Sequence, residues 1–264
     1  MTIDILFFIV IGLLAGFLSG MLGLGGGVVI VPGLVEWIAY TKLPIQQVMQ
    51  LCVGTSLSVM GMTALVSGFM HHKRGAVKWE LVRLLAPGTV AGAILGVQIA
   101  DLLPSLFLKK MFGVLLLLIA IQLLLFARPK EKEKLHMRGW MFLVSGFVVG
   151  ILAGMMGIGG GLLLVPLMLF NGVALLNASA TAPWCTLPTV IAGTVMAAWT
   201  GMNEPDLPRY TLGYIYWPAT LGIGFFSLFM APLGVKIAHD LDKVKLQRIF
   251  SLVLLLVSAR MIVS

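Results

Sequence analysis

Two stretches of the chain have the glycine spacing of a backbone anion site, and they are near-copies of each other. The pattern G-x-G-G-G-x-x-x-x-P occurs at Gly23–Pro32 and again at Gly157–Pro166. Over residues 16–34 and 150–168, ten of 19 positions are identical at a constant offset of 134. Glycines let an anion approach backbone N–H groups closely, and a helix that begins after them turns the positive end of its dipole toward that anion. The candidate anion-binding residues are Gly25, Gly26, Gly27 and Val28 in the first copy and Gly159, Gly160, Gly161 and Leu162 in the second.

A second interpretation of these glycines stays open. Small residues are common where membrane helices pack closely, so packing alone would also account for them. The other motif residues, Gly23, Pro32, Gly157 and Pro166, are expected to have a structural role. The prolines lie too far along to start a helix and are expected to kink the helices that follow.

Hydroxyl-bearing side chains follow each glycine stretch and are the next candidates for contact with an anion. Thr55 and Ser56 follow the first copy, and Thr181 follows the second at a roughly equivalent place. A hydroxyl can donate to an oxyanion, although Ser and Thr also bond back to carbonyls of their own helix. Arg83 is the candidate cation because a guanidinium binds oxyanions in a bidentate manner. Its alternative is to snorkel to the cytoplasmic membrane surface.

No cluster of residues indicates catalysis or a resident metal. Cys185 has no histidine within its apolar segment, and the adjacent His71 and His72 are expected in a solvated loop. The sequence therefore predicts a protein that is not an enzyme, with no cofactor and no metal. An intramembrane enzyme is the remote alternative, because it would need a nucleophile–base pair or a metal cluster at membrane depth.

The composition places all these residues in a membrane. Of 264 residues, 59% are hydrophobic and only 11% are charged, and the mean hydropathy is +1.05. A soluble domain needs a polar surface that this chain cannot supply, so the lipid bilayer is its expected environment. The net charge of +8 is assigned to basic cytoplasmic loops and not to nucleic-acid binding, because no basic domain exists outside the apolar segments.

A membrane helix needs about 20 apolar residues, and six stretches of that length are expected to span. The two glycine regions, residues 3–40 and 139–170, are instead broken near their middle, because glycine disfavours helix. Each reads as a helix, a glycine break and a half-helix, which forms either a re-entrant hairpin or a tilted pair of helices. The six expected spans are Val48–Met70, Glu80–Leu103, Ser105–Ala127, Ala178–Thr200, Leu212–Ala238 and Leu246–Ser264.

The duplication covers the whole chain and divides it into a first repeat half, residues 1–128, and a second, residues 139–264. Residues 95–114 match 233–252 at eight of 20 positions, at an offset of 138. A charged linker, residues 129–138, joins the halves. With the linker in the cytoplasm, 13 of the 18 Lys and Arg residues lie inside and both termini lie outside, as the positive-inside rule requires. The five basic residues outside are Lys42, Lys109, Lys110, Arg209 and Arg260.

This orientation predicts the fold class. The chain is expected to be an all-α polytopic protein of the cell inner membrane with two inverted-topology repeats, an architecture of many secondary transporters. Each repeat is a glycine-broken helix pair or hairpin plus three transmembrane helices. The two breaks would then enter from opposite faces and meet near the midplane.

The paired G-x-G-G-G-x-x-x-x-P motifs, at Gly23–Pro32 and Gly157–Pro166, resemble those of the TauE/SafE family of membrane transporters, the sulfite exporter family. The resemblance extends to the length, the two halves and the threonine-bearing segments that follow the motifs. It implies transport, often export, of sulfur-containing anions such as sulfite, thiosulfate or organosulfonates. The expected partner is thus a small oxyanion or organosulfonate substrate, moved by alternating access. A passive anion channel is the main alternative.

Overall fold

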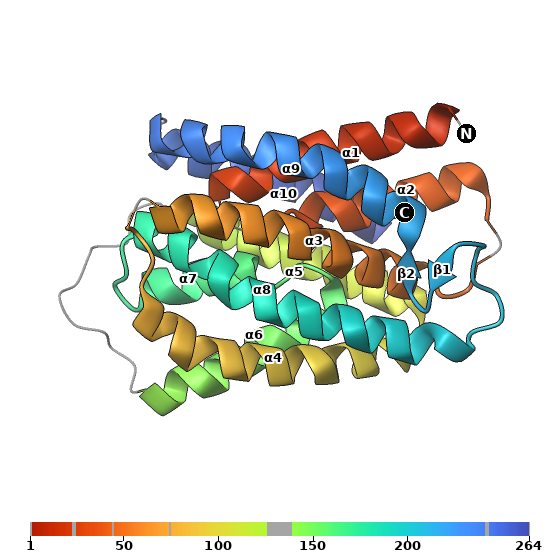
Figure 1. The fold of residues 1–264 in the computed structure, drawn as a ribbon, viewed down its shortest axis with the longest axis horizontal. Coiled ribbons are helices and arrows are strands. Elements are labelled where there is room, and N and C mark those ends of the chain that lie inside the picture. The colour runs from red at the N-terminus through yellow and green to blue at the C-terminus, as the bar shows by residue number, and fades with distance from the viewer. Residues whose placement is uncertain are drawn as a thin grey trace.

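The computed structural model describes residues 2–22, 25–43, 45–73, 75–125, 139–240 and 243–263, and these are almost entirely helical (Figure 1). Gly23 and the linker, residues 129–138, lie outside the described residues. The first half contains α1 (Thr2–Leu22), α2 (Gly27–Thr41), α3 (Val48–Lys73), α4 (Trp79–Asp101) and α5 (Ser105–Leu125). The second half contains α6 (Gly139–Met156), α7 (Gly161–Phe170), α8 (Leu175–Thr200), the short 3-10 helix η1 (Gly201–Asn203), the strands β1 (Thr211–Leu212) and β2 (Ile215–Tyr216), α9 (Trp217–Asp240) and α10 (Lys243–Val263).

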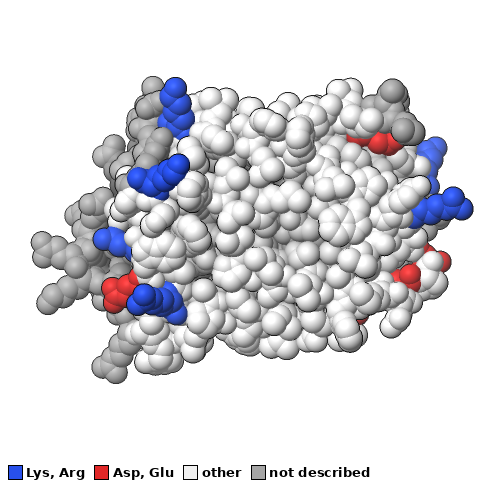
Figure 2. Space-filling model, in the orientation of Figure 1, with Lys and Arg blue, Asp and Glu red and all other residues white. Residues whose placement is uncertain are grey.

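The helices match the thickness of a bilayer. Within the described residues, seven are long and apolar enough to cross a membrane, namely α1, α3, α4, α5, α6, α8 and α9. Helix is the form expected of such runs, because in lipid every backbone N–H and C=O must be paired within the segment. On the face drawn in Figure 2, the charged residues lie at the two ends of the molecule and an uncharged band separates them. The chain is therefore an all-α, multi-pass membrane protein.

The glycine-broken regions are hairpins. The helix α1 starts at the end of the molecule that carries the N-terminus, and α2 returns the chain to that end (Figure 1). The pair α6 and α7 does the same from the opposite end. The return helices are short, at 15 residues for α2 and 10 for α7, so each begins inside the protein. Each hairpin thus pairs a helix long enough to span a membrane with a shorter return helix.

One expected span is shorter than the sequence suggested. The helix α9 begins at Trp217 and not at Leu212, and residues 211–216 form an antiparallel hairpin, with Thr211 paired to Tyr216. This hairpin lies between the two central helices: a Cβ on Gly54 of α3 would collide with the carbonyl of Tyr214, and Gly213 packs as closely on Ala198 of α8. Tyr214 and Ile215 of the hairpin are buried by protein, which hydropathy alone does not distinguish from burial in lipid.

The two halves pack on each other through rows of glycines. Along α1, Gly12 lies where a Cβ would be 2.7 Å from the carbonyl oxygen of Ile223 in α9. Along α6, Gly146 lies where a Cβ would be 2.7 Å from the carbonyl oxygen of Leu85 in α4. These contacts correspond under the offsets of the sequence repeat, 134 for the glycines and 138 for their partners. The rows continue in the same way, with Gly16 on Ser227 and Gly150 on Thr89, then Gly20 on Ala231 and Gly154 on Ala93.

Candidate anion-binding site

Both glycine breaks have the same backbone conformation. The residues that cap α2 and α7 are Gly26, with φ 79°, and Gly160, with φ 81°. Gly25 and Gly159 precede them, also at positive φ, 82° and 66°. A residue with a side chain costs roughly 1–2 kcal/mol in this left-handed region. Different glycines thus serve packing and chain reversal. The glycines in the rows along α1 and α6 allow close packing, whereas Gly25, Gly26, Gly159 and Gly160 turn the chain.

In each short helix, the first backbone N–H groups come before the first hydrogen bond of the helix. In α7, Leu163 and Leu164 donate to the carbonyl of Gly160 at 3.0 and 2.8 Å. The N–H groups of Gly161 and Leu162 precede these bonds. Like the first N–H groups of any α-helix, they have no acceptor within the helix. The arrangement recurs in α2, where Val29 and Ile30 bond Gly26 at 3.0 and 3.1 Å, after Gly27 and Val28.

The two breaks touch each other inside the protein. A Cβ on Gly27, the first residue of α2, would collide with the carbonyl of Gly157 and lie 2.8 Å from the Cα of Ile158. The hydroxyl of Ser56 in α3 donates to that same Gly157 carbonyl at 2.8 Å. The structure therefore brings together both glycine copies and Ser56, all of which the sequence assigned to one site. Pro32 and Pro166 are buried within α2 and α7.

The side chains between the two breaks are Met60 of α3 and Thr186 and Val190 of α8. A Cβ on Gly159 would lie 2.9 Å from the methyl carbon (Cγ2) of Thr186, 3.0 Å from Val190 and 3.1 Å from the Met60 sulfur. A Cβ on Gly25 would lie 2.9 Å from the same sulfur and 3.7 Å from Thr186. The Met60 thioether and the Thr186 methyl group thus both lie against Gly25 and Gly159, one glycine of each break.

Thr186 carries an unusual hydroxyl. Its side chain is fully buried, and its Oγ1 atom has no hydrogen-bond partner within the described chain. A buried hydroxyl without a partner costs about 1–3 kcal/mol.

The sequence analysis did not select Met60 or Thr186, although a signal for them exists. Thr181 follows Thr55 by 126 residues, and Thr186 follows Met60 by the same offset. The two residues are therefore equivalent positions in the duplicated central helices. Because one is a methionine and the other a threonine, a comparison of residue types did not reveal the match.

The structure does not bring Thr55 and Thr181 to the breaks. The Thr55 hydroxyl oxygen accepts the N–H of Tyr216, at 3.0 Å, and the Thr181 oxygen accepts that of Lys78, also at 3.0 Å. Tyr216 and Lys78 each directly precede a helix, α9 and α4. Each threonine is five residues from Met60 or Thr186, about 7.5 Å along a helix. Because α3 and α8 run in opposite directions (Figure 1), the two threonines lie on opposite sides of the breaks.

Arg83 and His71 lie away from the breaks. Arg83 is exposed near the start of α4, where a snorkelling side chain would be. His71 lies in the last turn of α3 and is only 1% exposed, so the expectation of a solvated loop is wrong for it. The helix continues through Lys73, about one turn beyond the expected end of the span, and this turn contains the buried His71. Among the described residues, no group of three or more His, Cys, Asp or Glu could hold a metal ion.

A buried tyrosine closes the end of the molecule that holds both termini. Tyr214, in the turn between β1 and β2, is 2% exposed, and its hydroxyl donates to Asp101 Oδ1 at 2.6 Å. Burial, and then this carboxylate, raise the pKa of Tyr214 above its usual value. Next to it, Gln47 donates to Glu204 at 3.0 Å. These bonds join the hairpin region to α4 and to the loop before α3.

The fold and the breaks define a class of protein. Two broken helices that meet inside an all-α, multi-pass membrane protein are typical of membrane transporters. The family model for the sulfite exporter TauE/SafE matches residues 8–261, and the chain belongs to this family.

Curated relatives support this assignment over the full length. A probable membrane transporter protein of Haemophilus influenzae is 32% identical over 97% of both chains. Probable membrane transporter proteins of Bacillus subtilis, 27% identical over 96% of both chains, and of Methanocaldococcus jannaschii, 26% identical over 93% of this chain and 91% of the relative, also match. No solved structure matches the chain.

Proposed function

We propose that this protein is a secondary transporter, acting as an exporter, of small sulfur-containing anions such as sulfite, thiosulfate or organosulfonates. The family supports the substrate class. The observation that carries the proposal is the contact of the two glycine breaks next to Thr186, whose hydroxyl is buried and has no partner within the described chain. Backbone N–H groups and one hydroxyl suit an oxyanion, because they hold negative charge without a buried cation.

The proposed site is smaller than the set of residues named from the sequence. It comprises the first-turn N–H groups of α2 and α7 and the Thr186 hydroxyl, with Ser56 fixing the second break. Thr55 and Thr181 instead hold the chain at the starts of α9 and α4, and Arg83 is left outside. In this site the Met60 side chain occupies space that a bound anion would need.

Alternating access follows from the arrangement of the halves. The matching glycine rows, and the hairpins that open to opposite ends, support two inverted-topology repeats related by a two-fold axis in the membrane plane. The hairpin of residues 211–216 lies at one end of the α3–α8 pair. The loop at residues 75–78, which Thr181 anchors, lies at the other. Rocking of the halves would open one end while the other stays closed. The proposed orientation has the linker in the cytoplasm and both termini outside.

The test is uptake of labelled sulfite into proteoliposomes that contain the purified chain. The informative variant is Gly159→Ala, because a methyl group there would press on Thr186, Val190 and Met60. The matched control is Gly75→Ala, which imposes a similar strain at φ 67° but meets no atom within 4 Å. We expect Gly159→Ala to lower sulfite uptake by at least about ten-fold, the effect of roughly 1.4 kcal/mol, and Gly75→Ala to retain it.

Two results would contradict the proposal. One is a wild-type rate no higher than that of empty liposomes for sulfite, thiosulfate and a sulfonate alike. The other is equal loss of uptake in both glycine variants, which would assign the effect to backbone strain. Uptake that follows the anion gradient without saturation would instead support the passive channel.

A further inference from the structure

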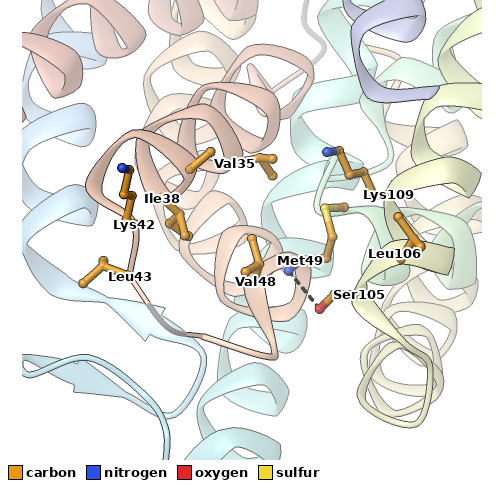
Figure 3. A pocket seen from close by; sticks show the side chains of 10 residues that line it. Val35, Ile38, Lys42, Leu43, Val48, Met49, Ser105, Leu106 and Lys109 are labelled. Carbon is orange, nitrogen blue, oxygen red and sulfur yellow. Dashed lines mark hydrogen bonds between the residues drawn. The ribbon is translucent and has the colours of Figure 1, made fainter. Parts of the chain in front are cut away.

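A pocket opens at the end of the molecule that holds both termini, away from the glycine breaks. It has a volume of about 400 Å³, within the range of ligand sites. It lies between the end of α2, the start of α3 and the start of α5 (Figure 3). Its walls are largely apolar and come from Val35, Ile38, Ala39, Leu43, Val48, Met49 and Leu106.

Two lysines lie at this pocket. Figure 3 shows Lys42, just after α2, and Lys109, on α5, on opposite sides of the pocket with Val48 and Met49 between them. Neither lysine forms an ion pair with a described residue. The nearby carboxylate, Glu36, is held by Arg260 through two bonds of 2.8 and 2.9 Å. Glu36 also lies within electrostatic range of Lys109 but forms its ion pair with Arg260, so the pocket combines an apolar wall with two lysines that have no ion-pair partner among the described residues.

The charges are in an unexpected place. In the proposed orientation this end faces outward, where a membrane protein carries few basic residues. Lys42 and Lys109 are two of the five exceptions. A ligand that needs positive charge at the membrane surface would account for them.

The apolar walls continue onto the lipid-facing side of α5. Leu106 is 58% exposed, and Val114 and Leu118, further along α5, are 48% and 59% exposed. A hydrocarbon chain could therefore leave the pocket past Leu106 and lie along α5 in the bilayer. A small free anion would use the lysines but not these walls.

We propose that this pocket binds an anionic phospholipid, with its phosphate between Lys42 and Lys109 and an acyl chain against Leu106 and α5. The site is separate from the proposed transport site, since the pocket lies at the far end of α2 from the glycine break. A lipid bound there would bridge the end of α2 and the start of α5, which both line the pocket. Ser105 fixes the corner of the pocket: its hydroxyl donates to the carbonyl of Gln46 at 2.8 Å and lies 3.4 Å from the N–H of Met49.

The test is native mass spectrometry of the full chain in detergent with added phosphatidylglycerol or phosphatidylcholine of identical acyl chains. We expect wild type to retain phosphatidylglycerol in preference. Lys42→Asn and Lys109→Gln should each lower its affinity about five-fold, the effect of ~1 kcal/mol per basic residue near an anionic lipid surface. Asparagine is chosen because Lys42 has φ 52°, which asparagine tolerates. Lys110→Gln is the matched control: it removes the same charge from the same helix but does not line the pocket.

A second variant tests the acyl chain without changing charge. Leu106→Trp fills the pocket at a half-exposed position, so the fold should tolerate it, and phosphatidylglycerol retention should fall as well. Equal retention of the two lipids by wild type, or an equal effect of Lys110→Gln and Lys109→Gln, would overturn the proposal. So would full competition by inorganic phosphate, which would make the pocket a site for free anions.

Discussion

Met60 and Thr186 face each other between the two glycine breaks, one from each central helix. Methionine is unbranched and flexible, so its side chain can leave the space beside Gly25 and Gly159 at little cost. Thr186 offers a hydroxyl that no protein atom within the described chain uses. We infer that Met60 fills the site when it is empty and that Thr186 contacts the anion when it is occupied.

Replacement of Thr186 by valine tests this role, because valine keeps the shape and removes the hydroxyl. A hydrogen bond to a charged group contributes about 1.5–3 kcal/mol, so we expect the affinity for sulfite to fall about ten-fold or more. Folding stability should stay constant or rise, because the buried hydroxyl has no partner to lose. Both are measured on purified protein, by sulfite binding and by thermal unfolding.

The control for Thr186→Val is Ser67→Ala. The Ser67 hydroxyl is also buried and unpartnered within the described chain, but it lies two turns from Met60 along α3. The Ser67→Ala variant should therefore bind sulfite with unchanged affinity. Equal affinity of wild type and Thr186→Val would remove the hydroxyl from the site.

Tyr214 predicts a dependence of stability on high pH. Its pKa in the folded protein is raised by burial and by Asp101, whereas an unfolded tyrosine titrates near pH 10. The neutral phenol therefore contributes stability that is fully present below about pH 10 and is lost as the pH rises through the folded-state pKa. We expect the melting temperature of wild type to fall above pH 10. Tyr214→Phe should lower the melting temperature at pH 7 and should make the melting temperature fall less at high pH. An identical dependence of the melting temperature on pH in both proteins would contradict this.

At the scale of elements, the glycine rows are the main contact between the halves. Gly16 and Gly150 pack so closely on the backbones of Ser227 and Thr89 that no Cβ fits. Overpacking of this kind costs typically 1–3 kcal/mol. The equivalence of the two rows means that equivalent substitutions should have similar effects.

We therefore expect Gly16→Ala and Gly150→Ala each to destabilise the protein by about 1–3 kcal/mol. Gly61→Ala is the matched control, since it is also within a helix but its nearest neighbour, Val190, is 3.9 Å from the new Cβ. It should be neutral or stabilise by up to about 1 kcal/mol, because alanine favours helix over glycine. The measurement is thermal unfolding in detergent. A clear difference between Gly16→Ala and Gly150→Ala would contradict the equivalence of the halves.

The helices were largely predictable from the sequence, and the reason is physical. An apolar run of 20 residues in lipid must be helical, so the expected span at Val48–Met70 corresponds to α3 at Val48–Lys73. The start of α9 was not predictable in this way, because the hairpin at residues 211–216 is apolar through burial against α3 and α8. At the site, the positive-φ glycines were found because their type fixes their role. Met60 and Thr186 were not, because their role depends on which helices pack together.

At the scale of the whole molecule, the two hairpins should open to opposite sides of the membrane. Lys42 follows the return helix of the first hairpin, and Phe170, 57% exposed, ends that of the second. We expect a membrane-impermeant maleimide to label Lys42→Cys in intact cells and Phe170→Cys only after permeabilisation. The unmodified chain is the background control, because Cys52 and Cys185 are both buried. Labelling of both variants in intact cells would show that the hairpins share one side.

The central claim is that the paired glycine breaks hold an oxyanion. The most direct measurement is a structure of the protein with selenite, the selenium analogue of sulfite, located by its anomalous scattering. We predict a selenium peak between the first turns of α2 and α7, within hydrogen-bond distance of the Thr186 hydroxyl, and a displaced Met60 side chain. Selenium bound elsewhere, with Met60 still between the breaks, would contradict it.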